Sequence, residues 1–508
     1  MKAAEASPEP PRRASPSAQA GALVFGTTLA TLSSALLPLL LVRLLGKGDI
    51  AELMALVLVY ETVALVTTLG FPQTLMYHLP SLDKLERKAV AKRVGFIMVG
   101  LGALSAAITT AIGIWGENLP GVLASEAGSR ISLRPLIVLA PSLLMELPSR
   151  VVPNLLVAEH RAREASALGV VRTIITTAAT LIPVALGQNI WVVAAWYSAC
   201  RFLLGLSLPW AIRLAYGDEP APPASVGAKQ LFRFALPLGA TDIVSLLNQQ
   251  FDRWLILLSF PAAAFADYQA GAWQVPVIST IAYSVGAAYM PSMVEDFKRG
   301  APRDAINTWR GTILKVSLIV VPVTMGFVVG ARELMGIMFT KAYVGAAPVF
   351  QLYSALTLGR VAAFGSVIVA AGRPRYVLQA ALLSFVANVV LAIPLTRMIG
   401  FIGPALATVL AFIPTVAFYV WAIGRAAGLP TREVFPLLGY LRILGLAGLA
   451  GLVAWLVKRQ LPESAPLALL TAVVVTLGAF ALLATLTGTV ARSDWRYLRD
   501  WMKLKFAR

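Results

Sequence analysis

Polar side chains gather inside one long apolar stretch of the chain, at residues 233–259. Its centre, LNQQFDRWLILL (247–258), carries three amide side chains together with Asp252 and Arg253. A charge at the centre of a bilayer costs about 2.5 to 3.5 kcal/mol on insertion scales, so these groups are expected to face protein or water. Guanidinium and amide groups bind anions and sugar hydroxyls through hydrogen bonds, which is the chemistry that this stretch offers.

A helix over 233–259 places most of these polar groups on one face, because successive residues turn by about 100°. Only Gln250 falls outside this stripe, whose members are Asp242, Ser245, Asn248, Gln249, Asp252 and Arg253. One interpretation is that the stripe lines an aqueous cavity. The alternative is that its members hydrogen-bond to neighbouring helices and only hold a bundle together. Such bonds average about 0.6 kcal/mol, a small gain for inserting two charges, which favours the cavity.

Other apolar stretches carry isolated charged groups. Glu146 and Arg150 lie four residues apart and can pair on one helix face, or can line a cavity. Arg201 and Arg360 lie at mid-depth and have no evident partner in their own helices, which favours a cavity. Glu61 fits a proton or sodium site, or a protonated carboxyl group bonded to a backbone carbonyl.

The sequence has no motif for covalent catalysis. It lacks a Walker loop, an HExxH helix and a Ser-His-Asp arrangement. His78 and His160 stand apart, and Cys200 is a single thiol in an apolar run, which argues against a metal site and excludes an intramolecular disulfide. We therefore expect neither an enzyme nor a bound cofactor. Transport work would draw on an Na⁺ or H⁺ gradient, the membrane potential or the substrate concentration.

The composition indicates a polytopic membrane protein. Of the 508 residues, 58% are hydrophobic and 13% are charged, and the mean hydropathy is +0.76. A spanning helix needs about 20 mostly apolar residues. Fourteen stretches meet this requirement: 21–45, 52–74, 94–115, 135–157, 166–187, 190–213, 233–259, 268–292, 311–331, 348–371, 377–396, 401–423, 437–456 and 466–489.

Two short coincidences indicate an internal duplication. Pro80-Ser81 recurs as Pro291-Ser292, and Ile182-Pro183 recurs as Ile393-Pro394, each 211 residues later. An offset of six spans preserves orientation, so the repeats are expected to be parallel. The predicted fold is thus all-α, with two six-helix lobes and two extra C-terminal helices. The predicted parts are a tail (1–20), a lobe (21–215), a linker (216–230), a lobe (231–425), spans 13 and 14 (426–489) and a basic amphipathic tail (490–508).

The net charge of +18 fits the positive-inside rule, and it predicts no nucleic-acid partner. Basic residues crowd the even-numbered loops, which places both termini in the cytoplasm. Residues 21–45 are too long for the apolar core of a signal peptide and are expected to form the first span. Arg172 lies near a span end and is expected to extend to the membrane interface.

Three stretches resemble the polysaccharide flippases (Wzx-type) of the multidrug/oligosaccharidyl-lipid/polysaccharide exporter superfamily. They are FRFALPLGATDIVSLLNQQFDRWLILLSFPAAAFADYQAGAWQVPV (232–277), LLPLLLVRLLGKGDIAEL (36–53) and VIVAAGRPRYVLQAALLSFVANVVLAIPLTRMIGFIGPALATVLA (367–411). The GRxRY turn before Asn388 and Pro394, followed by GPALAT, is the most distinctive part. The pattern extends over most of the first twelve predicted spans.

The resemblance implies two lobes that alternate between inward-open and outward-open states. It also implies a substrate, an oligosaccharide on an undecaprenyl pyrophosphate carrier, moved across a bacterial inner membrane for capsule, exopolysaccharide or O-antigen synthesis. Polysaccharide polymerase and chain-length machinery are implied partners, beside membrane lipids. The alternatives are a cation-coupled multidrug exporter and a lipid II flippase.

The resemblance assigns cationic groups to the pyrophosphate, and amides and hydroxyls to the sugars. The predicted substrate-binding residues are Arg253, Arg360, Arg201, Arg150, Asn248, Gln249, Ser245 and Gln274. The predicted ion-coupling carboxylates are Asp242, Asp252 and Glu61.

Overall fold

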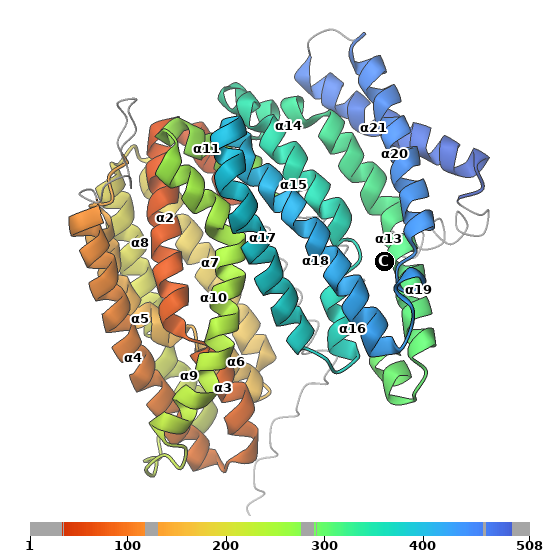
Figure 1. Cartoon of the computed structure of the whole chain (residues 1–508). Coiled ribbons are helices and arrows are strands. Elements are labelled where there is room, and N and C mark those ends of the chain that lie inside the picture. The colour runs from red at the N-terminus through yellow and green to blue at the C-terminus, as the bar shows by residue number, and fades with distance from the viewer. Residues whose placement is uncertain are drawn as a thin grey trace, which may run out of the picture. The chain divides into compact units, whose positions relative to one another are not determined.

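The computed structural model describes residues 33, 35–116, 131–275, 289–290, 292–460 and 464–489. Every regular element in these ranges is a helix (Figure 1). Eleven helical segments are long and apolar enough to cross a membrane, and one of them, Arg375–Ala427, contains two helices. The predicted fold class, an all-α polytopic membrane protein, is confirmed. Predicted spans 1 and 8 and the basic tail at 490–508 lie largely or wholly outside the described residues.

The chain divides into two compact units. Unit 1 contains the described residues of 35–45, 52–116 and 131–243, and unit 2 contains those of 46–51 and 244–489. The helices α2 (Lys47–Thr68) and α10 (Ala228–Ser259) each contribute to both units. The boundaries that the sequence suggests for the lobes and the linker stay predictions.

Unit 1 is built from helices that follow one another through short turns. They are α3 (Phe71–His78), α4 (Lys84–Trp115), α5 (Leu136–Ser149), α6 (Val152–Ala158), α7 (Ala162–Ala185), α8 (Ile190–Gly205) and α9 (Ser207–Tyr216), with the 3-10 turn η1 (Leu79–Ser81). The chain breaks between α2 and α3 at Leu69 and Gly70, which have φ of 50° and 73°. Gly70 suits this left-handed conformation because it has no Cβ.

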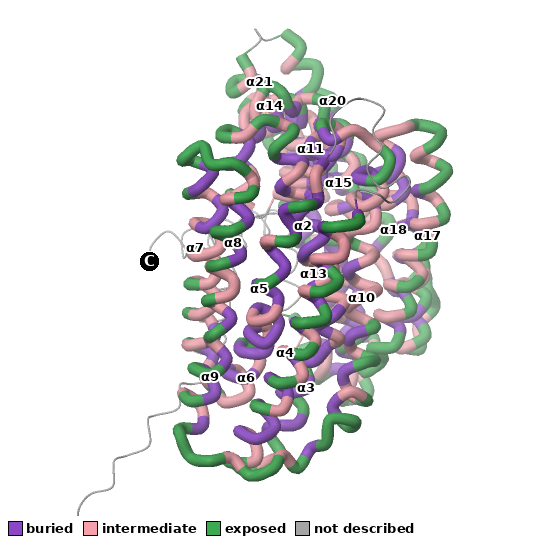
Figure 2. Tube along the Cα trace, turned by 90° about the vertical axis from the view of Figure 1, so that its left-hand side faces the viewer, coloured by how far each residue is buried: buried purple, intermediate pink, exposed green. Residues whose placement is uncertain are grey.

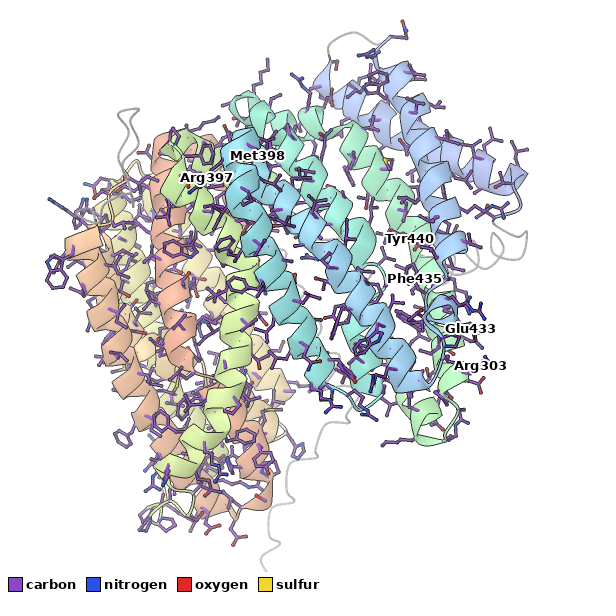
Figure 3. All side chains as sticks on the ribbon, in the orientation of Figure 1. Arg303, Arg397, Met398, Glu433, Phe435 and Tyr440 are labelled. Carbon is purple, nitrogen blue, oxygen red and sulfur yellow. The ribbon has the colours of Figure 1, made fainter. Side chains whose placement is uncertain are left out.

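Unit 2 continues with α11 (Ala262–Gly271), α13 (Pro302–Val329), α14 (Ala331–Met338), α15 (Ala347–Arg360), α16 (Phe364–Ala370), α17 (Arg375–Ile399), α18 (Gly403–Ala427), α19 (Thr431–Val434), α20 (Leu437–Lys458) and α21 (Ala465–Leu486), with 3-10 turns η3 (Lys341–Ala346) and η4 (Gly400–Ile402). Charged groups mark opposite ends of this unit. Arg303 bonds to Glu433 at 2.7 Å at one end, and Arg397 lies at the other (Figure 3).

The same sequence of helices and packing partners occurs in both units. Helix α5 and its counterpart α15 each have 14 residues, and α15 begins 211 residues after α5. The short helices α6 and α16 follow them, and α7 and α17 come next, with Pro183 and Pro394 inside. The contacts α4 with α5, α5 with α8 and α7 with α8 recur as α13 with α15, α15 with α18 and α17 with α18. This correspondence is what an internal duplication predicts.

The surfaces of these helices suit a lipid environment. Large apolar side chains are exposed along much of their length, among them Phe96 (77%), Met398 (78%) and Leu438 (85%). Figure 2 shows exposed segments recurring along the helices rather than only at their ends. Side chains of this kind are stable outside a protein core only when acyl chains cover them.

Close packing of α4 against α5 depends on a glycine. A Cβ at Gly102 would lie 2.7 Å from the carbonyl oxygen of Leu143 and 2.9 Å from that of Leu144. Neither backbone oxygen can move without displacing a helix turn. At Gly100, on the same helix, a Cβ would meet nothing within 4 Å.

We expect Gly102→Val to destabilise the purified protein by about 1 to 3 kcal/mol, because it overpacks the α4–α5 contact. Gly100→Val is the matched control and should leave stability close to that of the wild type. The measurement is the apparent Tm in detergent, followed by the loss of monodisperse protein on heating. Equal Tm values for the two variants would contradict this view of the α4–α5 contact.

Candidate functional site

Five charged side chains meet inside unit 1. They come from four helices: Glu61 on α2, Glu146 and the following Arg150 on and after α5, Arg172 on α7, and Arg201 on α8. Three of the five belong to the predicted site, namely Glu61, Arg150 and Arg201. We call this group the charge cluster.

Glu146 is the centre of the charge cluster, and its side chain is 0% exposed. One carboxylate oxygen accepts from Arg201 at 2.5 Å, from Arg150 at 3.0 Å and from Arg172 at 3.2 Å. The other accepts a short hydrogen bond from the hydroxyl of Tyr60. A carboxylate out of water is stable only with such compensation, so these contacts hold Glu146 in its ionised form.

Glu61 is the second acid of the charge cluster and the more accessible one. Its side chain is 35% exposed, and it accepts from Arg150 at 2.7 Å and from Arg201 at 3.2 Å. With three guanidinium groups and two carboxylates, the charge cluster has one positive charge in excess. The Nε atoms of Arg150 and Arg201 are buried and make no hydrogen bond with the described residues.

Two tyrosines fix Arg201 in position. Its guanidinium donates to the hydroxyl of Tyr197, which lies one turn earlier on α8, and lies 4.7 Å from the centre of that ring. The ring of Tyr60 lies 5.9 Å from the same guanidinium. Cation–π contacts of this geometry stabilise a cation at a fixed place. Arg201 is therefore held on three sides by Glu146, Tyr60 and Tyr197.

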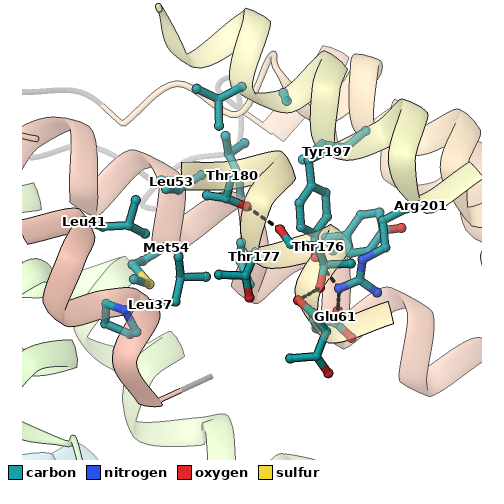
Figure 4. Close-up of a pocket in the computed structure, with 18 residues that line it drawn as sticks. Leu37, Leu41, Leu53, Met54, Glu61, Thr176, Thr177, Thr180, Tyr197 and Arg201 are labelled. Carbon is teal, nitrogen blue, oxygen red and sulfur yellow. Dashed lines mark hydrogen bonds and ion pairs between the residues drawn. The ribbon is translucent and has the colours of Figure 1, made fainter. Parts of the chain in front are cut away.

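A cavity of about 540 Å³ opens beside the charge cluster, within unit 1 (Figure 4). Its lining is aliphatic over most of the surface, with Arg201, Glu61 and Tyr197 grouped in one part. The lining residues are Leu37, Pro38, Leu41, Leu53, Met54, Leu56, Val57, Tyr60, Glu61, Leu139, Thr173, Thr176, Thr177, Thr180, Val193, Ala194, Tyr197 and Arg201. The volume falls within the range of about 300 to 1,000 Å³ that is typical of small-ligand sites.

Four threonines on α7 supply most of the hydroxyl groups of this cavity. Thr173, Thr176, Thr177 and Thr180 follow the spacing that places residues on one helix face. Three of their hydroxyls donate to backbone carbonyls four residues earlier, at 2.9 Å for Thr173 and Thr176 and 3.2 Å for Thr180. Their oxygen lone pairs remain available to accept hydrogen bonds from hydroxyl groups of a ligand.

The predicted polar stripe on α10 does not act as one group. Asp242 belongs to unit 1 and accepts from the amide of Gln73 at 3.1 Å. Asp252 belongs to unit 2 and is 2% exposed, and it accepts from the hydroxyl of Tyr268 at 3.1 Å. Arg253 donates to Gln250 at 3.0 Å, the residue that the helical wheel placed off the stripe.

The remaining predicted residues lie in unit 2. Asn248 accepts from Ser384 of α17 at 3.3 Å. Gln249 is exposed and Ser245 is half-buried. The guanidinium of Arg360 is exposed and makes no hydrogen bond or ion pair with any residue in the described ranges.

Gln274 and Thr357 line one small hollow of unit 2. Gln274 follows Glu61 by 213 residues, and Thr357 follows Glu146 by 211. These spacings match those between corresponding helices. In the second repeat, neutral side chains thus stand at the positions of the two acids of the charge cluster.

Two expectations for individual residues were wrong or incomplete. Arg172 does not extend to the interface; it bonds to Glu146 and, at 3.3 Å, to Ser149. Arg201 does have a partner in its own helix, Tyr197, besides the two acids. The sequence reasoning also overlooked Tyr60 and the threonines of α7, although the i, i+3, i+4, i+7 spacing of those threonines is a readable signal. The substrate and ion roles of the predicted residues stay predictions.

These features define a multi-pass membrane transporter, and comparison with known proteins places it more closely. The family model described as "Polysaccharide biosynthesis protein" matches residues 40–348, and the chain belongs to that family. A probable low-salt glycan biosynthesis flippase of Haloferax volcanii, Agl15, is 22% identical over 287 residues, covering 54% of this chain and 58% of the relative. The match thus spans less than two thirds of that relative.

Solved transporters share the fold. The lipid II flippase MurJ in its inward-closed conformation has a TM-score of 0.67 at 14% identity, over 91% of this chain and 98% of that one. A MOP superfamily transporter from Pyrococcus furiosus has a TM-score of 0.57 at 14% identity, over 82% and 97% of the two chains. At this identity the similarity concerns the fold alone.

We expect Glu146→Gln to destabilise the protein by about 3 to 5 kcal/mol, because it leaves three buried guanidinium groups around a neutral amide. Glu164→Gln is the control: this carboxylate pairs with Arg161 on the surface at 3.1 Å, with both side chains more than a third exposed, and its loss should cost less than about 1 kcal/mol. The measurement is the apparent Tm in detergent. A Glu146→Gln protein as stable as Glu164→Gln would show that the buried carboxylate does not organise the charge cluster.

Proposed function

We propose that the protein flips an oligosaccharide linked to undecaprenyl pyrophosphate from the inner to the outer leaflet of a bacterial inner membrane, for capsule, exopolysaccharide or O-antigen synthesis. Membership of a polysaccharide biosynthesis family and the similarity to a probable glycan flippase support this class of substrate. The observation that carries the proposal is the charge cluster beside a hydroxyl-lined cavity. In this topology both termini lie in the cytoplasm, and polymerase and chain-length proteins receive the product.

Arg201 is the residue best placed to bind the pyrophosphate. It lines the cavity, its position is fixed, and its Nε donor is unused by the described residues. A guanidinium stays charged in a low-dielectric site and can bond to two phosphate oxygens at once. The excess positive charge of the charge cluster favours an anion over the cationic drugs that a multidrug exporter carries. The threonine hydroxyls of α7 then face the first sugar.

Glu61 is the acid that a phosphate can displace. Its 3.2 Å contact with Arg201 is longer than the 2.5 Å contact of Glu146, and its side chain is partly exposed. Pyrophosphate binding to Arg201 would remove part of the positive charge that now compensates Glu61. The carboxylate then needs another cation, and H⁺ or Na⁺ can supply it. This exchange gives the predicted coupling site at Glu61 a mechanism, while Asp242 and Asp252 remain candidates without one.

The substrate-binding residues of unit 2 have a secondary role in this scheme. Arg253, Arg360 and Gln274 offer further donors, and Asn248 and Gln249 offer amides. They are candidates for the sugar chain beyond the first residue, because a cavity of about 540 Å³ holds only part of a lipid-linked repeat unit.

We expect Arg201→Ala to slow flipping by about ten- to a hundredfold, which corresponds to the loss of one charge-assisted hydrogen-bonded contact of about 1.5 to 3 kcal/mol. Arg201→Lys should keep part of the activity, because it keeps the charge but loses the planar fork. The measurement is the transfer of a fluorescent undecaprenyl-pyrophosphate-linked oligosaccharide between leaflets of proteoliposomes, with and without Na⁺ and pH gradients.

The control is Arg161→Ala, which removes a surface guanidinium of the same unit and should leave the rate unchanged. Wild-type flipping by Arg201→Ala at equal reconstitution would contradict the role of Arg201. A wild-type protein that moves lipid II or a cationic drug but no lipid-linked oligosaccharide would contradict the proposed function itself.

A further inference from the structure

Unit 1 has a second hollow, on the side of the helices away from the charge cluster. It measures about 600 Å³ and lies between the start of α4, the end of α5, α9 and the turn that follows α9. Its lining includes Lys88, Lys92 and Arg213 beside a series of apolar side chains. None of these residues takes part in the site described above. We call this hollow the α4–α9 groove.

A buried ammonium group lies at the base of the α4–α9 groove. Lys88 is 4% exposed, and its Nζ donates to the carbonyl oxygens of Gly217 and Glu219, both at 2.5 Å. No carboxylate within the described ranges forms an ion pair with it. An ammonium group has three donors, so one of them remains for a ligand oxygen. A buried cation without a counter-ion is costly, which makes an anionic ligand favourable here.

Two more cations surround Lys88, together with one acid. Lys92 lies one helix turn further along α4 and is exposed. Arg213 bonds to Asp218 at 2.8 Å, and both side chains are about 70% exposed. The α4–α9 groove therefore contains three positive charges and one negative charge. This excess selects for an anion and suits the single charge of a phosphodiester.

The rest of the α4–α9 groove is apolar and opens outward. Phe96 and Leu206 are 77% and 48% exposed, and Val99 and Leu208 continue the wall. Eleven residues of α4 separate Lys88 from Val99, a rise of about 16 Å at 1.5 Å per residue. Trp210, 48% exposed on α9, marks the depth at which aromatic side chains meet lipid headgroups. The groove thus passes from a basic headgroup level to the level of acyl chains.

We propose that the α4–α9 groove binds one anionic phospholipid of the surrounding leaflet. Its phosphate bonds to Lys88, Lys92 and Arg213, and one acyl chain lies along Phe96, Val99 and Leu206. A soluble phosphate would leave the apolar wall uncovered, and a zwitterionic lipid would bring a second cation toward three existing ones. Both features favour a phosphodiester with an apolar tail and no positive charge, such as phosphatidylglycerol.

The test is native mass spectrometry of the full chain in detergent, titrated with phosphatidylglycerol, phosphatidylcholine or inorganic phosphate. Phosphatidylglycerol should bind one to one, and the other two should not bind detectably at the same concentration. The double variant Lys92→Gln/Arg213→Gln should bind phosphatidylglycerol about tenfold or more weakly, since each basic side chain near the headgroup contributes to the affinity. It leaves Lys88 and its carbonyl contacts intact and should fold.

Two controls keep the proposal falsifiable. Lys84→Gln/Arg161→Gln removes the same charge elsewhere in unit 1 and should bind the lipid as the wild type does. Val99→Trp fills the apolar part of the α4–α9 groove, keeps every charge and should also weaken binding. Equal loss in the two charge-changing double variants, equal binding of phosphatidylcholine, phosphate binding as strong as lipid binding, or unchanged binding in Val99→Trp would each overturn the proposal.

Discussion

Unit 1 is organised around a carboxylate that has no access to water. Glu146 is compensated by three guanidinium groups and a phenol, and these come from α2, α5, α7 and α8. Burial of one ion without such partners costs several kcal/mol, so the four helices are constrained to meet at this depth. The compensation overshoots, because a single acid draws in three cations and Glu61 balances only one more. A buried acid thereby creates the positive charge on which recognition of an anion depends.

The two repeats have kept one packing plan and use it differently. Helices α15, α17 and α18 pack as α5, α7 and α8 do, and breaks in the chain occur at matching places. Where unit 1 has Glu61 and Glu146, unit 2 has Gln274 and Thr357 around a small hollow. Unit 2 instead buries Asp252 against Tyr268 and joins Asn248 to Ser384. The scaffold is duplicated, whereas the charge cluster belongs to one copy. A transporter built in this way can assign anion binding to one unit and ion coupling or sugar contacts to either.

Hydropathy sufficed to predict the fold class and most of the spans, because each membrane helix satisfies its own backbone hydrogen bonds. The offset of 211 residues was readable from two proline-containing dipeptides. Side-chain partners were less accessible, since a helical wheel describes one helix at a time. Arg172 was assigned to the interface because of its position along α7, and only the packing of α7 against α5 brings it to Glu146. The stripe on α10 was real as a pattern, but α10 belongs to two units, so Asp242 and Asp252 contact different neighbours. LNQQFDRWLILL is thus one half of a polar helix, and the larger concentration of charge lies elsewhere.

The most direct test is the position of the substrate's phosphates in an experimental structure of the protein bound to an undecaprenyl-pyrophosphate-linked oligosaccharide. Pyrophosphate density within hydrogen-bonding distance of the Arg201 guanidinium, with Glu61 displaced from it and Glu146 still in place, is the expected result. Pyrophosphate density elsewhere, with the contact between Arg201 and Glu61 intact and the cavity of unit 1 free of substrate, would contradict the central role given to the charge cluster.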